Sequence, residues 1–157
     1  MPISKGGSVV FKKAEIMKRH TFLDYVLGGC EINLSVAIDY TLSNKDPRDP
    51  KSLHCADLSR NQYYQALTSV GQICIYYDHS KRVPLFGFGG AIPPYLSQPS
   101  HCFALNGDIF NPYANGLGDV LSLYQRSLER VSLYGPTHMS EILGLINQMA
   151  ANEEVSQ

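Results

Sequence analysis

A mostly apolar run that ends in regularly spaced oxygen-bearing side chains constrains the fold of this 157-residue chain more than any other feature. The run is Ile32–Ile38, and polar and turn-forming residues bound it on the far side. Such a run is typical of a strand that is buried on both faces of a parallel sheet. We therefore predict that Ile32–Ile38 is the central and most buried strand of an α/β sheet.

Asp39, Thr41 and Ser43 follow this strand at alternate positions. Open α/β sheets bind their ligands at the carboxyl ends of the strands. One carboxylate and two hydroxyls, without His or Cys, suit magnesium, manganese or calcium rather than zinc or copper. The sequence therefore predicts a hard-cation site at this end of the sheet. For Asp39 the alternative is a metal-free role, in which its carboxylate caps backbone amides at the strand end.

Three helices are predicted from apolar residues that recur at spacings of three and four. The first covers Asn61 to about Tyr77, and a capping box formed by Ser59 and Gln62 is expected to start it. The second covers Leu117–Val131, with Asn115 as its cap, and the third carries the apolar positions from Met139 to Met149.

Other segments are predicted from their β-branched, glycine and proline content. Arg82–Gly89 and His101–Leu105 are expected to be strands, and so is Ser8–Ile16 near the start. Thr21 is expected to cap a short helical turn that Gly28 and Gly29 end. The charged, proline-containing stretch 44–51 is expected to be a surface loop.

Composition narrows the possible partners. A net charge of −1 with 17% charged residues creates no overall field for nucleic acid or an anionic membrane, so no nucleic-acid partner is predicted. The four cysteines show no C-x-x-C spacing, so sulfur ligation of a metal is not indicated and reduced thiols are expected. No apolar run reaches the roughly 18 residues that a membrane-spanning helix needs.

Enzymatic interpretations explain fewer residues. An aspartate-dependent phosphatase would need a second acid two positions after Asp39, and Thr41 stands there. Ser43 lacks the G-x-S-x-G turn of a serine hydrolase. The glycines of Gly87–Ala91 lead into two prolines, Pro93 and Pro94, rather than into the helix that a phosphate loop requires.

The motif and its surroundings resemble a known family. Asp39-Tyr-Thr41-Leu-Ser43 resembles the D-x-[ST]-x-S motif of the metal-ion-dependent adhesion site in von Willebrand factor type A domains, and the form with threonine in the middle resembles the copines. Further segments resemble copines in the same order: Thr21–Tyr25, Gly28–Gly29, Ile32–Asn44, Ala66–Gly71, Gly87–Gly89, Leu105–Gly107 and Leu133–Thr137. The resemblance extends from about Gly7 to the end of the chain.

The resemblance implies a fold and a domain organisation. The fold is a three-layer, Rossmann-like von Willebrand factor A-type α/β sheet with helices on both faces, incomplete at the C-terminus. Residues 1–20 would be a lead followed by the terminal strand of a preceding C-two lipid-binding domain, and residues 21–157 the N-terminal part of the type A domain. His101–Leu105 would form its antiparallel edge.

The resemblance also implies a function and a ligand set. Thr41, Ser43 and Thr137 would be hydroxyl ligands of magnesium or manganese and Asp39 the anionic anchor, in a site that is weakened or lost in this chain because the second metal-site aspartate is missing. The type A domain would be a non-catalytic module that recruits target proteins through this site. Complete copines would bind calcium and phospholipid through their C-two domains, in the cytoplasm and, with calcium, at the plasma membrane.

Two expectations complete the interpretation. The first is self-association or poor stability, because a central strand without its second neighbour exposes apolar side chains and open hydrogen-bonding groups. The second is a rival function: a metal-free structural scaffold, in which Asp39 and Thr137 only cap backbone amides.

Overall fold

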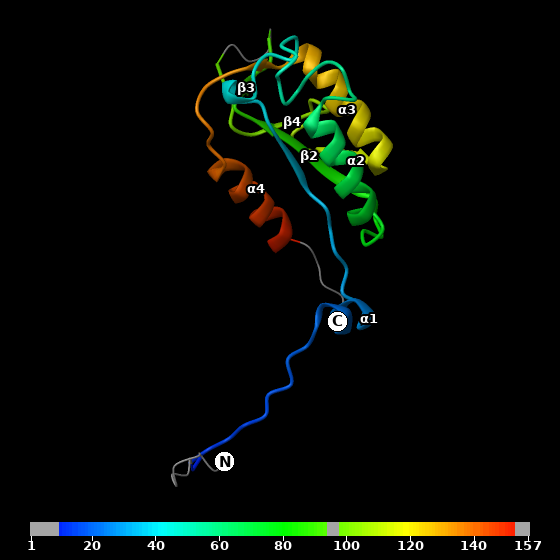
Figure 1. The fold of residues 1–157 in the computed structure, drawn as a ribbon, viewed down its shortest axis with the longest axis vertical. Helices are drawn as coiled ribbons and strands as arrows, with labels where there is room; N and C mark the ends of the chain where they lie inside the picture. Colours follow the sequence, from blue (N-terminus) through cyan, green and yellow to red (C-terminus); the bar gives the residue numbers. More distant parts are fainter. Residues whose placement is uncertain (1–9, 94–97, 153–157) are drawn as a thin grey trace, which may run out of the picture. The chain divides into compact units, whose positions relative to one another are not determined.

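The computed structural model of the chain describes residues 10–93 and 98–152 (Figure 1). Its elements in chain order are α1 (Phe22–Leu27), β1 (Val36–Asp39), the 3₁₀ turn η1 (Leu42–Asn44), α2 (Gln62–Cys74), β2 (Arg82–Phe88), β3 (Gly90–Ala91), β4 (Phe103–Ala104), β5 (Tyr113–Asn115), α3 (Gly116–Arg130), β6 (Ser132–Leu133) and α4 (Ser140–Ala151).

The first of two compact units comprises residues 1–30. Its helix α1 begins as expected at Thr21, whose hydroxyl accepts the amide of Asp24 while the Asp24 carboxylate accepts the amide of Thr21. The expected strand Ser8–Ile16 is wrong for residues 10–16, which are irregular and exposed; Ser8 and Val9 lie outside the described residues. β-Branched residues form a strand only where a neighbouring strand accepts their hydrogen bonds. The origin of residues 1–20 in a C-two domain stays a prediction.

The second unit, residues 31–157, contains a mixed sheet in the order β1-β2-β4, with β5 also paired to β2. β1 runs parallel to β2, and β4 and β5 run antiparallel to it. β2 is therefore the central strand, and it is buried from Val83 to Phe88. The prediction that Ile32–Ile38 is the central, most buried strand is wrong. In the described residues β1 pairs with β2 alone, and self-association through its other edge stays a prediction.

Pro84 explains why β1 is shorter than expected. Backbone groups along a strand alternate between its two edges. Leu85 donates its amide to Pro112 on the β5 side and Phe88 accepts the amide of Tyr40 on the β1 side, so the backbone of Pro84 also faces β1. Proline has no amide hydrogen to donate. The ladder therefore starts at Val36, and the preceding Leu34 donates its amide to the carboxylate of Asp78 instead.

The sheet of this unit lies between two helical layers, as the family resemblance implied (Figure 1). On one face α2 and α3 pack against Ile38, Tyr40, Val83 and Leu85 in the main core. On the other face α4 packs through Ile142 against Phe86 and Phe88. None of the helices in residues 10–93 and 98–152 is long and apolar enough to cross a membrane.

The helices match their predicted positions, but their caps differ. α2 is capped by Asn61, whose side-chain oxygen accepts the amide of Tyr64, so the expected capping box of Ser59 and Gln62 is wrong. The Ser59 hydroxyl instead donates to Asp57 in the preceding turn. α2 also ends at Cys74 rather than near Tyr77. At α3, the side chain of Asn115 makes no capping bond, and its amide donates to the carboxylate of Asp119.

Gly87 provides a test of packing in the central strand. A Cβ there would lie 2.5 Å from the Phe103 ring and 2.8 Å from the Tyr40 ring, both in the core. We expect Gly87→Ala to lower the free energy of unfolding by about 1–3 kcal/mol because overpacking displaces these rings.

The matched control is Gly144→Ala in α4, where an added Cβ meets no atom within 4 Å. Alanine is the better helix former, so this change should raise stability by about 0.5–1 kcal/mol. Urea unfolding monitored by circular dichroism measures both. Equal effects of the two substitutions would contradict the close packing at Gly87.

Candidate metal-binding site

The candidate site begins where β1 ends at Asp39. The chain then makes the turn η1, in which Asn44 donates its amide to Thr41 and Lys45 to Leu42. This turn brings the hydroxyl oxygens of Thr41 and Ser43 to 3.0 Å from each other. One carboxylate oxygen of Asp39 accepts the amide of Thr41 at 2.8 Å. The motif residues thus lie together at the carboxyl end of the strand.

Thr137 reaches the same place from a distant part of the sequence. Its hydroxyl lies 3.4 Å from the hydroxyl of Thr41. The short β3–β6 ladder leads to Tyr134, whose amide lies within hydrogen-bonding distance of the carbonyls of both Tyr40 and Gly89. Gly89 has a positive φ of 71°, and a Cβ there would clash with the Thr41 methyl group. Glycine therefore lets the strand end approach the Thr41 loop closely.

The spacing of these oxygens fits a hard cation. Neighbouring ligands of an octahedral magnesium at about 2.1 Å are roughly 3.0 Å apart, and a calcium shell at about 2.4 Å gives roughly 3.4 Å. The Thr41–Ser43 distance of 3.0 Å matches the first value and the Thr41–Thr137 distance of 3.4 Å the second, and both are also hydrogen-bonding distances between hydroxyls. The charge is low, however, because Asp39 is the only carboxylate among the sequence-predicted ligands. In residues 10–93 and 98–152 no group of three His, Cys, Asp or Glu side chains could hold a metal ion.

The side chain of Asn44 stabilises the motif turn through hydrogen bonds to its backbone. Its side-chain amide donates to the carbonyls of Asp39 at 3.0 Å and Thr41 at 3.3 Å. Its side-chain oxygen accepts the hydroxyl of Tyr63 at 3.1 Å. Burial and the nearby Asp39 carboxylate raise the pKa of Tyr63 to about 12, so its hydroxyl stays a donor at neutral pH. The buried Asn44 side chain thereby fixes the backbone on which the predicted ligands stand.

His54 forms a second hydrogen bond to the same carbonyl of Asp39. Its Nε2 lies 2.7 Å from that oxygen and its Nδ1 lies 2.9 Å from the Tyr124 hydroxyl. The ring is fully buried and stacks on Tyr63 at 4.1 Å and on Tyr40 at 5.4 Å between ring centroids. Burial lowers the pKa of His54, which favours the neutral ring. A carbonyl can only accept, so the one proton of the neutral ring lies on Nε2, and Nδ1 faces the hydroxyl oxygen of Tyr124.

A buried network extends this support into both helices. The Tyr124 hydroxyl on α3 also lies 2.9 Å from the Asn61 side-chain oxygen at the start of α2. The Tyr40 hydroxyl bonds to Ser127 on α3. Burial raises the pKa values of Tyr40 and Tyr124, which therefore remain protonated. The strand end that carries the candidate site is thus tied to the layer formed by α2 and α3.

Sequence patterns did not reveal the supporting residues. His54 and Asn61 lie 15 and 22 positions after Asp39, and His54 bonds to a carbonyl of the backbone rather than to a side chain of the motif. Asn44 lies at the end of the resembling segment, but its position in the motif assigns it no role. Neither His54 nor Asn61 carries a local signal of this role, because neither has the spacing of a metal motif and Asn61 lies between two polar residues.

A comparison with known families matches residues 52–157 to the family described as Copine. The match covers more than half of the chain and includes Thr137, β2 and all helices from α2 onward. Asp39, Thr41 and Ser43 precede the matched range, so their assignment as ligands rests on the motif and on the geometry described above.

His54→Phe tests whether the buried network supports the strand end. Phenylalanine keeps a ring between Tyr40 and Tyr63 but removes both nitrogens. The Asp39 carbonyl and the Tyr124 hydroxyl then each lose a hydrogen-bond partner. We expect the free energy of unfolding to fall by about 1–3 kcal/mol. Amide exchange measured by mass spectrometry should accelerate in residues 39–44.

The control is His79→Phe, the same substitution at a side chain that is 78% exposed and lies 3.9 Å from Glu31. An exposed pair of this kind contributes little, so the change should stay within about 0.5 kcal/mol. Similar losses in the two variants would show that the effect belongs to phenylalanine itself and not to the network.

Proposed function

The chain belongs to the copine family, and we propose that it is a non-catalytic protein-binding module that recruits partners through a divalent cation held by Asp39, Thr41, Ser43 and Thr137. The observation that supports this most is the convergence of three hydroxyls beside one carboxylate at the carboxyl end of β1. An all-oxygen set of this kind suits a hard cation. We propose magnesium or manganese, because the 3.0 Å between the Thr41 and Ser43 hydroxyls matches a small ion.

Each residue has a distinct task in the proposed site. Asp39 supplies the only negative charge, and its orientation depends on the amide of Thr41. Thr41 is 1% exposed and would be the inner ligand. Ser43 and Thr137 are exposed and would be the outer ligands, so the site is open on their side. When bound, the cation supplies a positive charge at a point that solvent and partners can reach.

The partner ligand follows from the charge of this set. One carboxylate and three neutral hydroxyls leave a divalent cation with uncompensated charge and with positions for further oxygen ligands. A carboxylate from another protein meets both needs. We therefore propose that the target proteins offer an aspartate or glutamate at an exposed position.

The setting of the complete protein is part of the same proposal and is supported by family membership alone. Copines would attach to phospholipid through C-two domains when calcium rises, which moves them from the cytoplasm to the plasma membrane. The module proposed here would then present its bound targets at that membrane.

Two other functions account for part of the site. A metal-free scaffold is favoured by the hydrogen bond from the Thr41 amide to Asp39, which a capping role alone would explain. In a scaffold, the contacts of Ser43 and Thr137 with the Thr41 hydroxyl would serve only as hydrogen bonds between side chains. A phosphatase-like enzyme has less support, because the position of its second acid is taken by Thr41, which is buried.

A manganese titration tests the proposal. Calorimetry and electron paramagnetic resonance on this chain should show one Mn²⁺ site, and Mg²⁺ should compete for it. Asp39→Asn removes the only charged ligand while keeping the side-chain shape. We expect it to weaken Mn²⁺ binding by more than about tenfold, equivalent to ~1.4 kcal/mol.

The matched control is Asp57→Asn, at an exposed carboxylate that bonds within its own turn to Ser59. Its Mn²⁺ affinity should equal that of the unmodified chain. Equal affinities of the Asp39 and Asp57 variants, or no binding in a chain shown to be folded, would favour the metal-free scaffold.

A further inference from the structure

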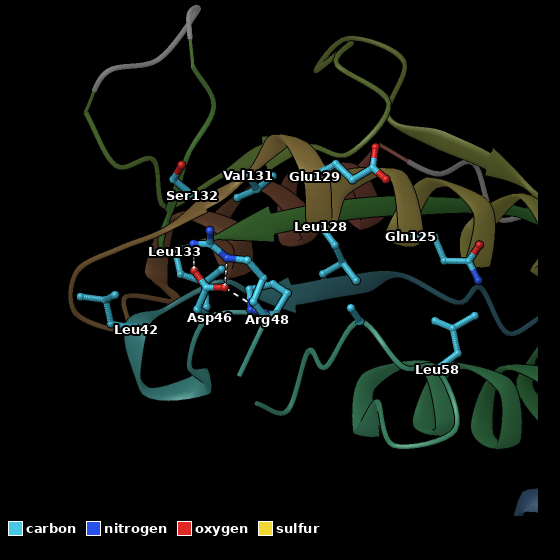
Figure 2. Close-up of a pocket in the computed structure, with 12 residues that line it drawn as sticks. Leu42, Asp46, Arg48, Leu58, Gln125, Leu128, Glu129, Val131, Ser132 and Leu133 are labelled. Atoms are coloured by element: carbon cyan, nitrogen blue, oxygen red, sulfur yellow. Dashed lines mark hydrogen bonds and ion pairs between the residues drawn. The ribbon is translucent and has the colours of Figure 1, made fainter. Parts of the chain in front are cut away.

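An open groove lies beside the candidate metal site. It has a volume of about 710 Å³ and is bounded by the loop after β1 on one side and by α3 and β6 on the other (Figure 2). Leucines from both walls line it: Leu42 and Leu58 from the loop, Leu128 from α3 and Leu133 from β6. Aliphatic side chains thus lie on both walls of the groove, beside polar ones.

Leu42 joins this groove to the metal site. It stands between the two motif hydroxyls in sequence, at Thr41 and Ser43, and its side chain lines the groove. The side chain is 62% exposed, unlike that of a core leucine. A partner carboxylate that reached the hydroxyls would therefore have its neighbouring residues next to Leu42. Leu42 is thus the point at which the loop that carries the two hydroxyls borders the groove.

The charges around the groove are unequal. Asp46 and Arg48 form a two-bond ion pair at 2.8 and 2.7 Å, and Arg48 holds the pKa of Asp46 well below its usual range, so this pair neutralises itself. Glu129 on α3 is exposed, and no ion pair in the described part of the chain neutralises it. The groove therefore offers one free negative charge, which favours a cationic side chain in whatever lies there.

The length of the groove limits its occupant. One wall runs from Gln125 and Glu129 on α3 to Val131, the residue that follows the helix. A helix rises ~1.5 Å per residue, so this wall is roughly 10 Å long. An extended chain advances ~3.3 Å per residue, so about three residues of an extended segment fit along it.

We propose that this groove receives the residues adjacent to the partner's metal-binding carboxylate, and that the partner presents a short linear segment with an acidic residue, large aliphatic residues and a lysine or arginine in that spatial order. The acid faces Thr41, Ser43 and Thr137, the aliphatic side chains cover Leu42 and Leu128, and the cation lies near Glu129. This inference rests on the proposed function, because the acidic residue needs the bound cation.

Fluorescent peptides test the inference on the full chain with Mn²⁺ present. The main probe contains Asp-Leu-Leu-Lys. A reversed probe contains Lys-Leu-Leu-Asp, because a peptide can run along the groove in either direction. Binding is measured by fluorescence anisotropy. For the better of the two, replacing both leucines by glycine should weaken binding more than about tenfold, because the aliphatic contacts are lost. Replacing lysine by glutamate should weaken it by about threefold, as expected for a solvent-exposed charge.

Variants of the protein test which of its residues contact the peptide. Leu42→Ala should reduce affinity for the leucine probe but not for the glycine probe, and its fold should persist because Leu42 is exposed. Leu143→Ala, at a 54% exposed leucine on α4 outside the groove, is the matched control and should change neither. Glu129→Lys should reverse the preference between lysine and glutamate probes, whereas Glu141→Lys on α4 should leave it unchanged.

The outcomes separate this inference from the proposed function. If the chain binds no Mn²⁺ when no peptide is present, both the proposed function and this inference are refuted. Mn²⁺ binding with equal affinity for the leucine and glycine probes would overturn the groove and leave the function standing. Leucine-dependent binding that persists after chelation of Mn²⁺, or after aspartate in the probe is replaced by asparagine, would also overturn the inference, because it requires the acid at the metal.

Discussion

The geometry of the candidate site depends on the carbonyl oxygen of Asp39. Backbone groups alternate between the edges of a strand, and those of Ile38 and Tyr40 serve the ladder with β2, so the carbonyl of Asp39 faces the edge where β1 has no described neighbour. A buried carbonyl needs a donor. His54 Nε2 and the Asn44 side-chain amide supply two. Asn44 lies in the turn and His54 in the loop after it. The hydrogen bonds to this one oxygen therefore fix the path of both segments.

The donors are themselves held in place, and this explains the unusual polarity of the core beside the sheet. His54 lies between Tyr40 and Tyr63, and the hydroxyls of Tyr63 and Tyr124 continue the network to Asn44 and Asn61. Such a network stabilises little more than an apolar core would, but it permits few alternative geometries because each unpaired member costs about 1–3 kcal/mol. A site whose ligands are neutral hydroxyls benefits from that rigidity, since positioning must replace some of the missing charge.

The sequence predicted those parts of the fold that local pattern determines. The periodic apolar positions located α2, α3 and α4, the motif located Asp39, Thr41 and Ser43 together, and the family resemblance placed Thr137 beside them. The errors arose where a distant partner decides the outcome. Pro84 determines where β1 begins, although it lies in another strand. Asn61 rather than Ser59 caps α2 because it also bonds to Tyr124 and to the Cys55 carbonyl. His54 gave no local signal at all, because its function depends on stacking against residues 14 positions before and 9 positions after it.

The low charge of the proposed ligand set has a thermodynamic consequence for recruitment. A cation held by one carboxylate and three hydroxyls keeps most of its positive charge, so a partner's carboxylate and the cation stabilise each other's binding by the same factor. Neither interaction alone then needs to be strong. The coupling supplies affinity but little selectivity, because every protein surface offers carboxylates. In the proposed complex, selectivity instead comes from the aliphatic groove, which begins at Leu42 within the motif itself, so the residue that links the two hydroxyl ligands in sequence also links metal dependence to partner choice.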